Sequence, residues 1–342
     1  MSHRFHDAAE TAALLPYGAL RDELAAVLAE HERGELFLRE RLILPLPHGT
    51  LLAMPASDAR LSITKVVTVH PGNAARGLPT INGEVIVCRA DDGTRLGLLH
   101  GGTVTMRRTA AVSLLAARLM GFDARATVGA ATGSDAPPRR LLIVGAGDQA
   151  RGHAEAFTEE LAIDSVTVAS RTAARAEALV AGLRSRGVDA TAVGPGTDSF
   201  REAVANSDII VTATTSATPV ITGAVRPGAG IFAVGAYRAE MAELSPALVA
   251  GAGRVVVDTL AGARHEAGEL IDAVAAGVWA WDEAETLLDL LVGRSTRREV
   301  GAGGERDGQP VGAPDAGPYQ VFKSVGHAMY DLAAARVAFP AT

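Results

Sequence analysis

The hydrophobic pattern of the first third of the chain changes from helical to strand-like. Over residues 7–31, leucines and valines recur at helical spacing between charged positions, which predicts a helix. Short apolar and β-branched runs separated by Pro, Gly and Asn then predict strands at 42–45, 50–54, 62–69, 83–88 and 96–99. Asp91-Asp92-Gly93 is a hairpin signal before the last strand. An Ala/Leu-rich helix is predicted over 105–120, where Gly121 ends it.

The second part of the chain alternates between apolar strand patterns and helical patterns. The apolar runs lie at 141–144, 166–169, 209–213, 230–235 and 254–258. Runs of this length and β-branched content are typical of a buried parallel sheet, so we expect an α/β fold with a doubly wound sheet. Residues 131–138 are predicted to be a linker and residues 300–317 an exposed loop. The tail over 321–337 is predicted to be helical.

Composition limits the classes of function. With 342 residues, of which 48% are hydrophobic and 21% charged, the chain is long enough for two globular domains. A net charge of -7 argues against nucleic-acid binding and against an anionic membrane surface. Cys88 is the only cysteine, which excludes an intrachain disulfide, and no apolar leader or spanning segment is apparent. We therefore expect a cytoplasmic protein, and the scattered histidines predict no metal site.

A glycine-rich turn between a predicted strand and a predicted helix points to a dinucleotide. Its residues are Gly145, Gly147, Asp148, Gln149 and Ala150. The first glycine permits a tight turn, the second lets the backbone approach phosphates, and the alanine keeps the helix close to the sheet. The N–H groups of the helix N-terminus then face the pyrophosphate.

The end of the next strand decides between the two nicotinamide dinucleotides. It carries Ser170, Arg171 and Thr172, with no carboxylate to accept hydrogen bonds from a free ribose 2′-hydroxyl. A guanidinium and two hydroxyls suit a 2′-phosphate, so we expect NADPH, with NADH possible. The alternative is that Arg171 is only a solvated residue near a helix N-terminus.

Three cations stand out in the first part of the chain: Arg41 before a strand, Lys65 within one, and Arg108 at the start of a helix. A lysine in an apolar strand is unusual because burying an unpaired ammonium is costly, although an exposed face is the simpler reading of each cation alone. Together with Pro71-Gly72-Asn73, the glycine turn and Phe322–Gly326, these residues resemble the ornithine cyclodeaminase/μ-crystallin family over nearly the whole chain.

That resemblance implies a Rossmann-type nucleotide-binding domain inserted into an α+β substrate and dimerisation domain, and a homodimer. The domains would be residues 123–317 and residues 1–122 plus 318–342. In the family, two arginines and a lysine hold an amino-acid or imino-acid carboxylate; matched here, they are Arg41, Lys65 and Arg108, as suits a planar anion. Arg107 falls one position off the motif. The resemblance further places Asn73, Thr109, Ser324 and Val325 near the substrate or the nicotinamide.

One departure from the family pattern bears on the reaction. Cyclodeaminases carry an aspartate where this chain has Tyr237, and a glutamate where it has Leu52. Without these acids, a diammonium substrate is poorly bound and amine deprotonation lacks a base. The chain therefore resembles the ketimine-reductase branch, which implies NADPH-dependent reduction of 1-pyrroline-2-carboxylate to L-proline and of 1-piperideine-2-carboxylate to L-pipecolate. Tyr237 either lines the pocket or is a packed aromatic.

Three alternatives stay open from the sequence. The chain could be an ornithine or lysine cyclodeaminase, or an amino-acid dehydrogenase of the same family. It could also be a non-catalytic NADPH-binding protein, although the retained cations argue against lost catalysis. His100 stands where the family has an aspartate, and the sequence gives no reason for that change.

Overall fold

The computed structural model describes residues 4–39, 41–122, 139–221, 223–294 and 318–340. They form two compact units, Met1–Leu115 with Gly326–Thr342, and Ala116–Val325. The linker and loop predicted at 131–138 and 300–317 lie outside the described residues. No helix in the described ranges combines the length and the apolar character that crossing a membrane requires.

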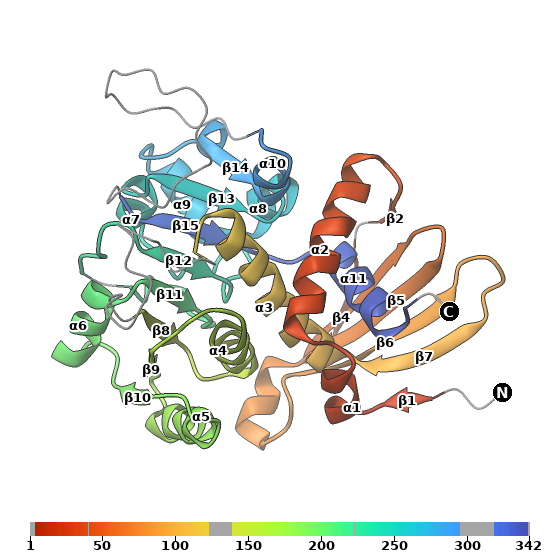
Figure 1. Cartoon of the computed structure of the whole chain (residues 1–342), viewed down its shortest axis with the longest axis horizontal. Helices are drawn as coiled ribbons and strands as arrows, with labels where there is room; N and C mark the ends of the chain where they lie inside the picture. Colours follow the sequence, from red (N-terminus) through yellow and green to blue (C-terminus); the bar gives the residue numbers. More distant parts are fainter. Residues whose placement is uncertain (1–3, 40, 123–138, 222, 295–317, 341–342) are drawn as a thin grey trace. The chain divides into compact units, whose positions relative to one another are not determined.

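The first unit is built on a mostly antiparallel sheet of seven strands (Figure 1). Its order is β1-β7-β6-β5-β4-β2, and β3 also pairs with β4. The strands are β1 (Phe5–His6), β2 (Phe37–Leu38), β3 (Leu42–Leu46), β4 (Gly49–Ser57), β5 (Leu61–Val69), β6 (Ile81–Arg89) and β7 (Arg95–His100). The strands predicted between residues 42 and 99 are thus confirmed.

The helices of the first unit are α1 (Ala8–Ala13), α2 (Tyr17–Glu32), the 3-10 helix η1 (Pro71–Arg76), α3 (Gly101–Leu119) and α11 (Ala328–Ala338). The single helix predicted over 7–31 is wrong, because the chain breaks between α1 and α2. Pro16 caps α2 with an extended backbone, and proline favours the start of a helix over its interior. The division between the two units falls within α3.

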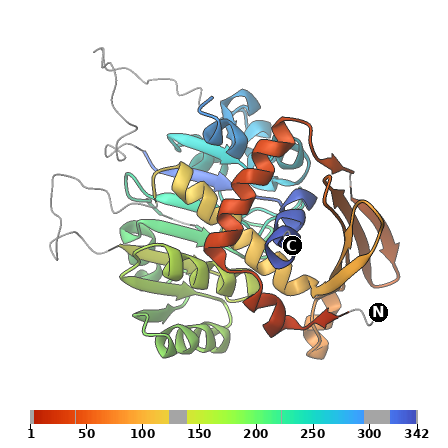
Figure 2. The ribbon, with the colours of Figure 1, turned by 45° about the vertical axis from the view of Figure 1, so that its right-hand side comes forward.

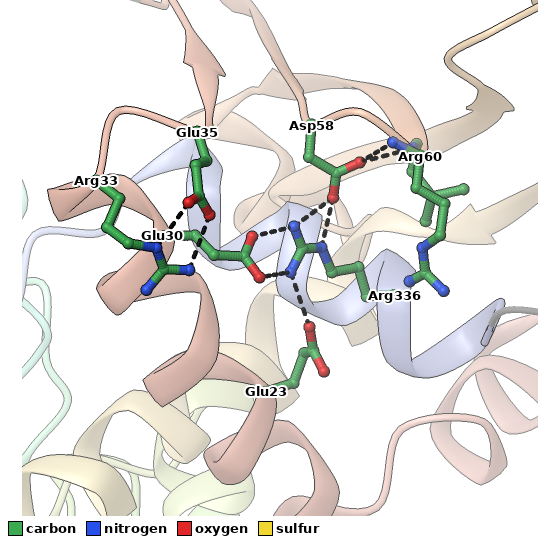
Figure 3. Close-up of polar contacts among 8 residues, drawn as sticks. Glu23, Glu30, Arg33, Glu35, Asp58, Arg60 and Arg336 are labelled. Carbon is green, nitrogen blue, oxygen red and sulfur yellow. Dashed lines mark hydrogen bonds and ion pairs between the residues drawn. The ribbon is translucent and has the colours of Figure 1, made fainter.

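Helix α11 packs against α2, β4 and β5, and the red and blue helices lie side by side in Figure 2. Near its C-terminal end, the nearly buried Arg336 contacts three carboxylates (Figure 3). Its Nη1 donates to Glu23 at 3.1 Å and to Glu30 at 3.0 Å, and its Nε donates to Asp58 at 2.5 Å. Because these acids come from α2 and from the β4–β5 turn, Arg336 fixes α11 against both.

The second unit contains an eight-stranded sheet in which every pairing is parallel. Its order is β10-β9-β8-β11-β12-β15-β13-β14. The strands are β8 (Arg140–Val144), β9 (Ser165–Ala169), β10 (Ala190–Val193), β11 (Ile209–Thr212), β12 (Gly230–Ala233), β13 (Arg254–Val257), β14 (Ala284–Thr286) and β15 (Gln320–Lys323). The chain moves outward from β8 to β10 and returns to β11 on the other side of β8. Ligands of such sheets bind outside the carboxyl ends of the strands at this reversal.

Helices connect these strands, which confirms the predicted α/β class with a doubly wound sheet. They are α4 (Asp148–Glu160), α5 (Ala173–Ser185), α6 (Asp198–Asn206), α7 (Pro246–Ala250), α8 (Leu260–Glu266), α9 (Gly268–Ala275), η2 (Trp281–Glu283) and α10 (Leu287–Leu291).

Strand β15 was missed by the sequence reading. The predicted helix over 321–337 is wrong at its start, because residues 320–323 form a strand between β12 and β13 and the helix begins only at Ala328. Val321 and Phe322 are both fully buried, so this strand has no polar face and shows no alternating period. The compact units divide after β15, at Val325, whereas the resemblance to the family implies that residues 318–342 belong to the substrate domain.

Candidate functional site

Lys65 lies on the buried face of the first unit's sheet. Alternate residues of β5 are buried, and Lys65 shares their face with only 3% of its surface exposed. An ammonium buried this deeply needs a counter-ion. Its partner is Asp331 of α11, whose Oδ2 lies 2.7 Å from Lys65 Nζ. The simpler reading of Lys65 as an exposed strand residue is therefore wrong.

Arg108 of α3 reaches the same carboxylate from the other side. Its Nε donates to Oδ1 of Asp331 at 3.2 Å, and the arginine is itself buried. Gly326 has φ +86°, and a Cβ there would lie 2.9 Å from Nη1 of Arg108. The guanidinium therefore packs directly against the backbone that precedes α11, where a side chain would be strained and would collide with it.

The charges around Lys65 set its protonation. Burial lowers the pKa of Lys65 to about 8, the negative charge of Asp331 opposes that shift, and the positive charges of Arg108 and the half-buried Arg41 reinforce it. Lys65 and Arg108 thus share one carboxylate, and Arg41 adds a third positive charge that acts on Lys65, which leaves an excess of positive charge. Such a cluster attracts an anion, and its guanidinium groups suit the planar, bidentate geometry of a carboxylate.

Other predicted residues of the first unit have local roles. Asn73 in η1 donates from Nδ2 to the carbonyl of Pro79 at 2.9 Å. The hydroxyl of Thr109 donates to the carbonyl of Thr105, one turn earlier in α3, at 2.7 Å. Arg107 donates to the carbonyl of Leu15 at 2.6 Å and stacks on the ring of Tyr17, so its side chain binds α3 to the segment between α1 and α2. These side-chain contacts connect neighbouring segments of backbone.

Two residues of this unit need the structure to be understood. Asp331 was not predicted, although a lone carboxylate in an Ala/Leu-rich helix is a signal, because burying it requires a cationic partner. His100 precedes α3, and its Nδ1 accepts a hydrogen bond from the backbone N–H of Thr103 at 3.1 Å. It therefore caps the helix, a role that the side chain of an aspartate can also fill.

The glycine turn of the second unit has the shape that a pyrophosphate needs. Gly145 has φ +128°, and a Cβ there would lie 2.4 Å from the carbonyl oxygen of Ala213 after β11. Gly147 caps α4 with no side-chain hydrogen bond, and the space beside it is open. Ala150 is fully buried against the sheet. The turn therefore leaves the N-terminus of α4 accessible to an anion.

The residues that follow the glycines hold the turn in place. The exposed Asp148 pairs with Arg151 at 3.0 Å. Burial lowers the pKa of His153 to about 4, so its ring is neutral at pH 7 and its Nδ1–H donates to the carbonyl of Gln149 at 2.8 Å. This hydrogen bond fixes the carbonyl of Gln149 in the first turn of α4.

The carboxyl end of β9 carries the residues expected to choose the cofactor. The hydroxyl of Ser170 accepts a hydrogen bond from the N–H of Thr172 at 3.2 Å, and Arg171 and Thr172 are exposed. An exposed guanidinium at this edge is available to a phosphate.

The remaining predicted residues of the second unit lie at the ends of β12 and β15. Tyr237 is half-buried, and its hydroxyl accepts from Arg238 at 3.3 Å. The hydroxyl of Ser324 and the N–H of Val325 both donate to the buried Asp258, at 2.8 and 3.0 Å. The hydroxyl of Ser324 is thus hydrogen-bonded to the loop after β13. Among the described residues, no cluster of His, Cys, Asp and Glu could hold a metal ion.

Comparison with known proteins gives one family. Residues 1–340 match the model of the ornithine cyclodeaminase/mu-crystallin family. A "Delta(1)-pyrroline-2-carboxylate reductase 1" of Burkholderia multivorans is 40% identical, over 97% of this chain and 94% of that protein. A "Delta(1)-pyrroline-2-carboxylate/Delta(1)-piperideine-2-carboxylate reductase" of Azospirillum brasilense is also 40% identical, over 97% and 94%.

A solved structure has the same fold. It is Thermococcus litoralis Delta(1)-pyrroline-2-carboxylate reductase in complex with NADH and L-proline. The likeness has a TM-score of 0.79 and 25% identity, and it covers 95% of this chain and 93% of that one. An archaeal alanine dehydrogenase, with a TM-score of 0.78 and 24% identity over 96% and 92%, supports the fold alone.

Proposed function

Because the chain belongs to the ornithine cyclodeaminase/mu-crystallin family, we propose that it reduces 1-pyrroline-2-carboxylate to L-proline with a nicotinamide cofactor. The observation that carries this proposal is the buried cluster of Lys65, Arg108 and Asp331, whose excess positive charge fits a carboxylate. The reductase names of the relatives at 40% identity support the same reaction.

Each side chain has a distinct part in this reaction. Arg41 and Arg108 hold the substrate carboxylate, and Asp331 keeps Arg108 and Lys65 in place. Reduction adds a hydride to the imine carbon and leaves one proton to be supplied to the ring nitrogen. Lys65 is a cation below pH 8 and stabilises negative charge or supplies that proton.

The second unit binds the cofactor in this proposal. The pyrophosphate binds at Gly145, Gly147 and the N-terminus of α4, because the space beside Gly147 is open and no side chain caps the helix. The cofactor supplies the hydride when bound. We expect Asp148, Gln149 and Ala150 to support this turn, and Thr109, Ser324, Val325 and Tyr237 to lie near the nicotinamide.

Reduction is favoured over deamination by two side chains. Tyr237 and Leu52 stand where cyclodeaminases carry acids, so neither a second ammonium nor amine deprotonation is supported here. A preformed cyclic imine needs neither acid. The six-membered homologue, 1-piperideine-2-carboxylate, has the same carboxylate and C=N group, and we propose it as a second substrate.

The proposed reaction is tested by incubating the purified protein and NADPH with each cyclic imine and, separately, with L-ornithine and NADP⁺ or NAD⁺. Loss of nicotinamide absorbance with the imines, L-proline as a product and no ammonia from ornithine are expected. Robust release of ammonia from ornithine would replace reduction by deamination. Tight cofactor binding without turnover of any imine would support the non-catalytic alternative.

We propose NADPH as the preferred cofactor. Arg171→Ala is expected to raise the KM for NADPH by about tenfold or more, because a charge-assisted contact with the 2′-phosphate is lost, while the KM for NADH stays nearly unchanged. Arg201→Ala, in α6 and paired with Asp198, is a matched control of similar exposure. Steady-state kinetics with both cofactors measures the effect. Equal changes in the two KM values contradict a phosphate contact at Arg171.

We also propose a homodimer formed through the first unit. Four large apolar residues are highly exposed: Phe37 by 69%, Leu42 by 58%, Ile43 by 60% and Leu44 by 50%. An exposed apolar strand attracts a partner surface, because its burial removes apolar area from water. Light scattering is expected to give twice the chain mass for the native protein and a monomer for Ile43→Asp. A native monomer contradicts this proposal.

A further inference from the structure

Glu243 joins two loops at the carboxyl edge of the parallel sheet. It is fully buried, and its two oxygens have different partners. Oε1 accepts from the N–H and the hydroxyl of Thr214 at 2.7 and 2.8 Å, in the loop after β11. Oε2 accepts from the N–H of Gly235 at 2.7 Å, after β12, and from the hydroxyl of Thr212 at 3.0 Å. One carboxylate therefore sets the spacing between two loops.

The same loops pack closely on one another and on the glycine turn. A Cβ on Gly235 would lie 2.2 Å from the carbonyl oxygen of Thr214 and 2.6 Å from Oε1 of Glu243. A Cβ on Gly145 would lie 2.4 Å from the carbonyl oxygen of Ala213. The glycine turn and the loops after β11 and β12 thus touch in succession, and a shift in one of them displaces the next.

Lys323 holds the second loop by its carbonyl. This lysine at the end of β15 is fully buried, and its Nζ donates to the carbonyl oxygen of Ala236 at 2.6 Å. It also lies 3.0 Å from Oε1 of Glu269, which is its counter-ion. The 235–236 segment is therefore fixed at its N–H side by Glu243 and at its carbonyl side by Lys323, immediately before Tyr237.

Burying the charges of Glu243 and Lys323 costs free energy, so their presence in the core needs an explanation. Apolar residues of similar volume often stabilise a core as well as a buried ion pair does. Backbone groups that leave a strand, however, need hydrogen-bond partners wherever they are buried. Glu243 and Lys323 provide these partners for loops at the carboxyl ends of β11 and β12, which is where a doubly wound sheet binds a dinucleotide.

We propose that Glu243 and Lys323 are positioning residues that fix the 213–214 and 235–237 loops in the conformation that binds the nicotinamide half of the cofactor. The proposal rests on the proposed function only in requiring a nicotinamide cofactor, and it does not depend on which imine is reduced.

Glu243→Gln tests the carboxylate with little change in volume. The amide retains one acceptor oxygen, so its NH₂ group must face N–H donors of one of the two loops. We expect the Kd for NADPH to rise by about tenfold or more. Glu285→Gln is a matched control: Glu285 is a buried carboxylate of β14, paired with Arg254 at 2.9 Å, and strands β15 and β13 separate β14 from β12 in the sheet. It is expected to lower the melting temperature without changing the Kd.

Binding is measured by fluorescence titration without substrate, on protein whose circular dichroism shows the native fold. Hydrogen exchange of peptides spanning 213–216 and 235–237 is expected to accelerate in Glu243→Gln and to stay native in Glu285→Gln. Thr212→Val removes one hydroxyl bond to Glu243 and serves as a milder variant if Glu243→Gln does not fold. Its Kd is expected to rise about threefold.

The outcomes separate this proposal from the proposed function. The positioning role is overturned if folded Glu243→Gln has the native Kd for NADPH and native hydrogen exchange. If only Thr212→Val folds, the same result in that variant overturns it. An equal rise in Kd in Glu285→Gln also overturns it. Native NADPH binding without turnover of any imine would overturn only the reductase assignment, because the titration contains no imine.

Discussion

Replacing Lys65 with methionine is expected to lower kcat/KM for 1-pyrroline-2-carboxylate at least about 100-fold. Methionine fills similar space on the buried face of β5, but it has no charge and no proton to give. Asp331 keeps Arg108 as a partner in this variant, so one ion pair of the cluster survives. Steady-state kinetics at pH 7 measures the loss, and thermal unfolding confirms that the variant is folded.

The pH dependence of kcat/KM tests whether the ionisation of Lys65 controls the rate. Because the pKa of Lys65 is about 8, the side chain is a cation below this pH and loses its proton above it. We therefore expect kcat/KM to be constant below pH 8 and to fall about tenfold per pH unit well above it. Lys65→Met is expected to lack this descending limb.

Lys65→Arg separates two roles and controls for ionisation of the substrate. Arginine keeps the positive charge but holds its proton throughout this pH range. If Lys65 supplies a proton, this variant is as slow as Lys65→Met; if it acts by charge alone, the variant retains much of the activity and loses the limb near pH 8. A native profile that stays flat to pH 9.5, or a limb shared by all three proteins, contradicts the assignment to Lys65.

The parts of the fold that were predicted correctly are those with a strong local signal. Strand β5 alternates strictly between buried and half-buried residues, so its pattern has a period of two. The turn at Gly145 is defined by backbone conformation, which glycine alone tolerates. Strand β15 gave no such signal, because a short strand covered on both faces resembles a segment of a buried helix.

In the candidate site, individual residues were predicted from the sequence, but their ion-pair and hydrogen-bond partners were not. The resemblance to the family singles out Lys65 and Arg108, but the sequence does not state which anion lies between them. That anion, Asp331, is 223 residues beyond Arg108 and is brought to it only by the packing of α11 against the sheet. Likewise, the sequence does not show that the hydroxyl of Ser324 bonds to Asp258, which lies 66 residues earlier in the chain. Long-range pairings of this kind depend on tertiary packing.

Asp331→Asn is expected to lower the free energy of unfolding by about 3–5 kcal/mol, because it leaves the buried Lys65 and Arg108 without their counter-ion. Urea denaturation at pH 7 measures this loss. Asp289→Asn is a matched control in α10, where the carboxylate is only partly buried and bonds to Thr286 and Arg294. Its loss is expected to be about 1 kcal/mol.

The direction in which the pKa of Lys65 changes in Asp331→Asn distinguishes the loss of an ion pair from a general loosening of the core. The charge of Asp331 raises the pKa of Lys65 against the effect of burial, so its removal leaves desolvation and the two arginines to lower that pKa further. The descending limb of kcat/KM in Asp331→Asn is therefore expected below pH 8. The double variant Lys65→Met/Asp331→Asn buries one unpaired cation fewer, and we expect it to be more stable than Asp331→Asn. A double variant that is less stable, or a limb that stays near pH 8, means that the three side chains are not coupled through Asp331.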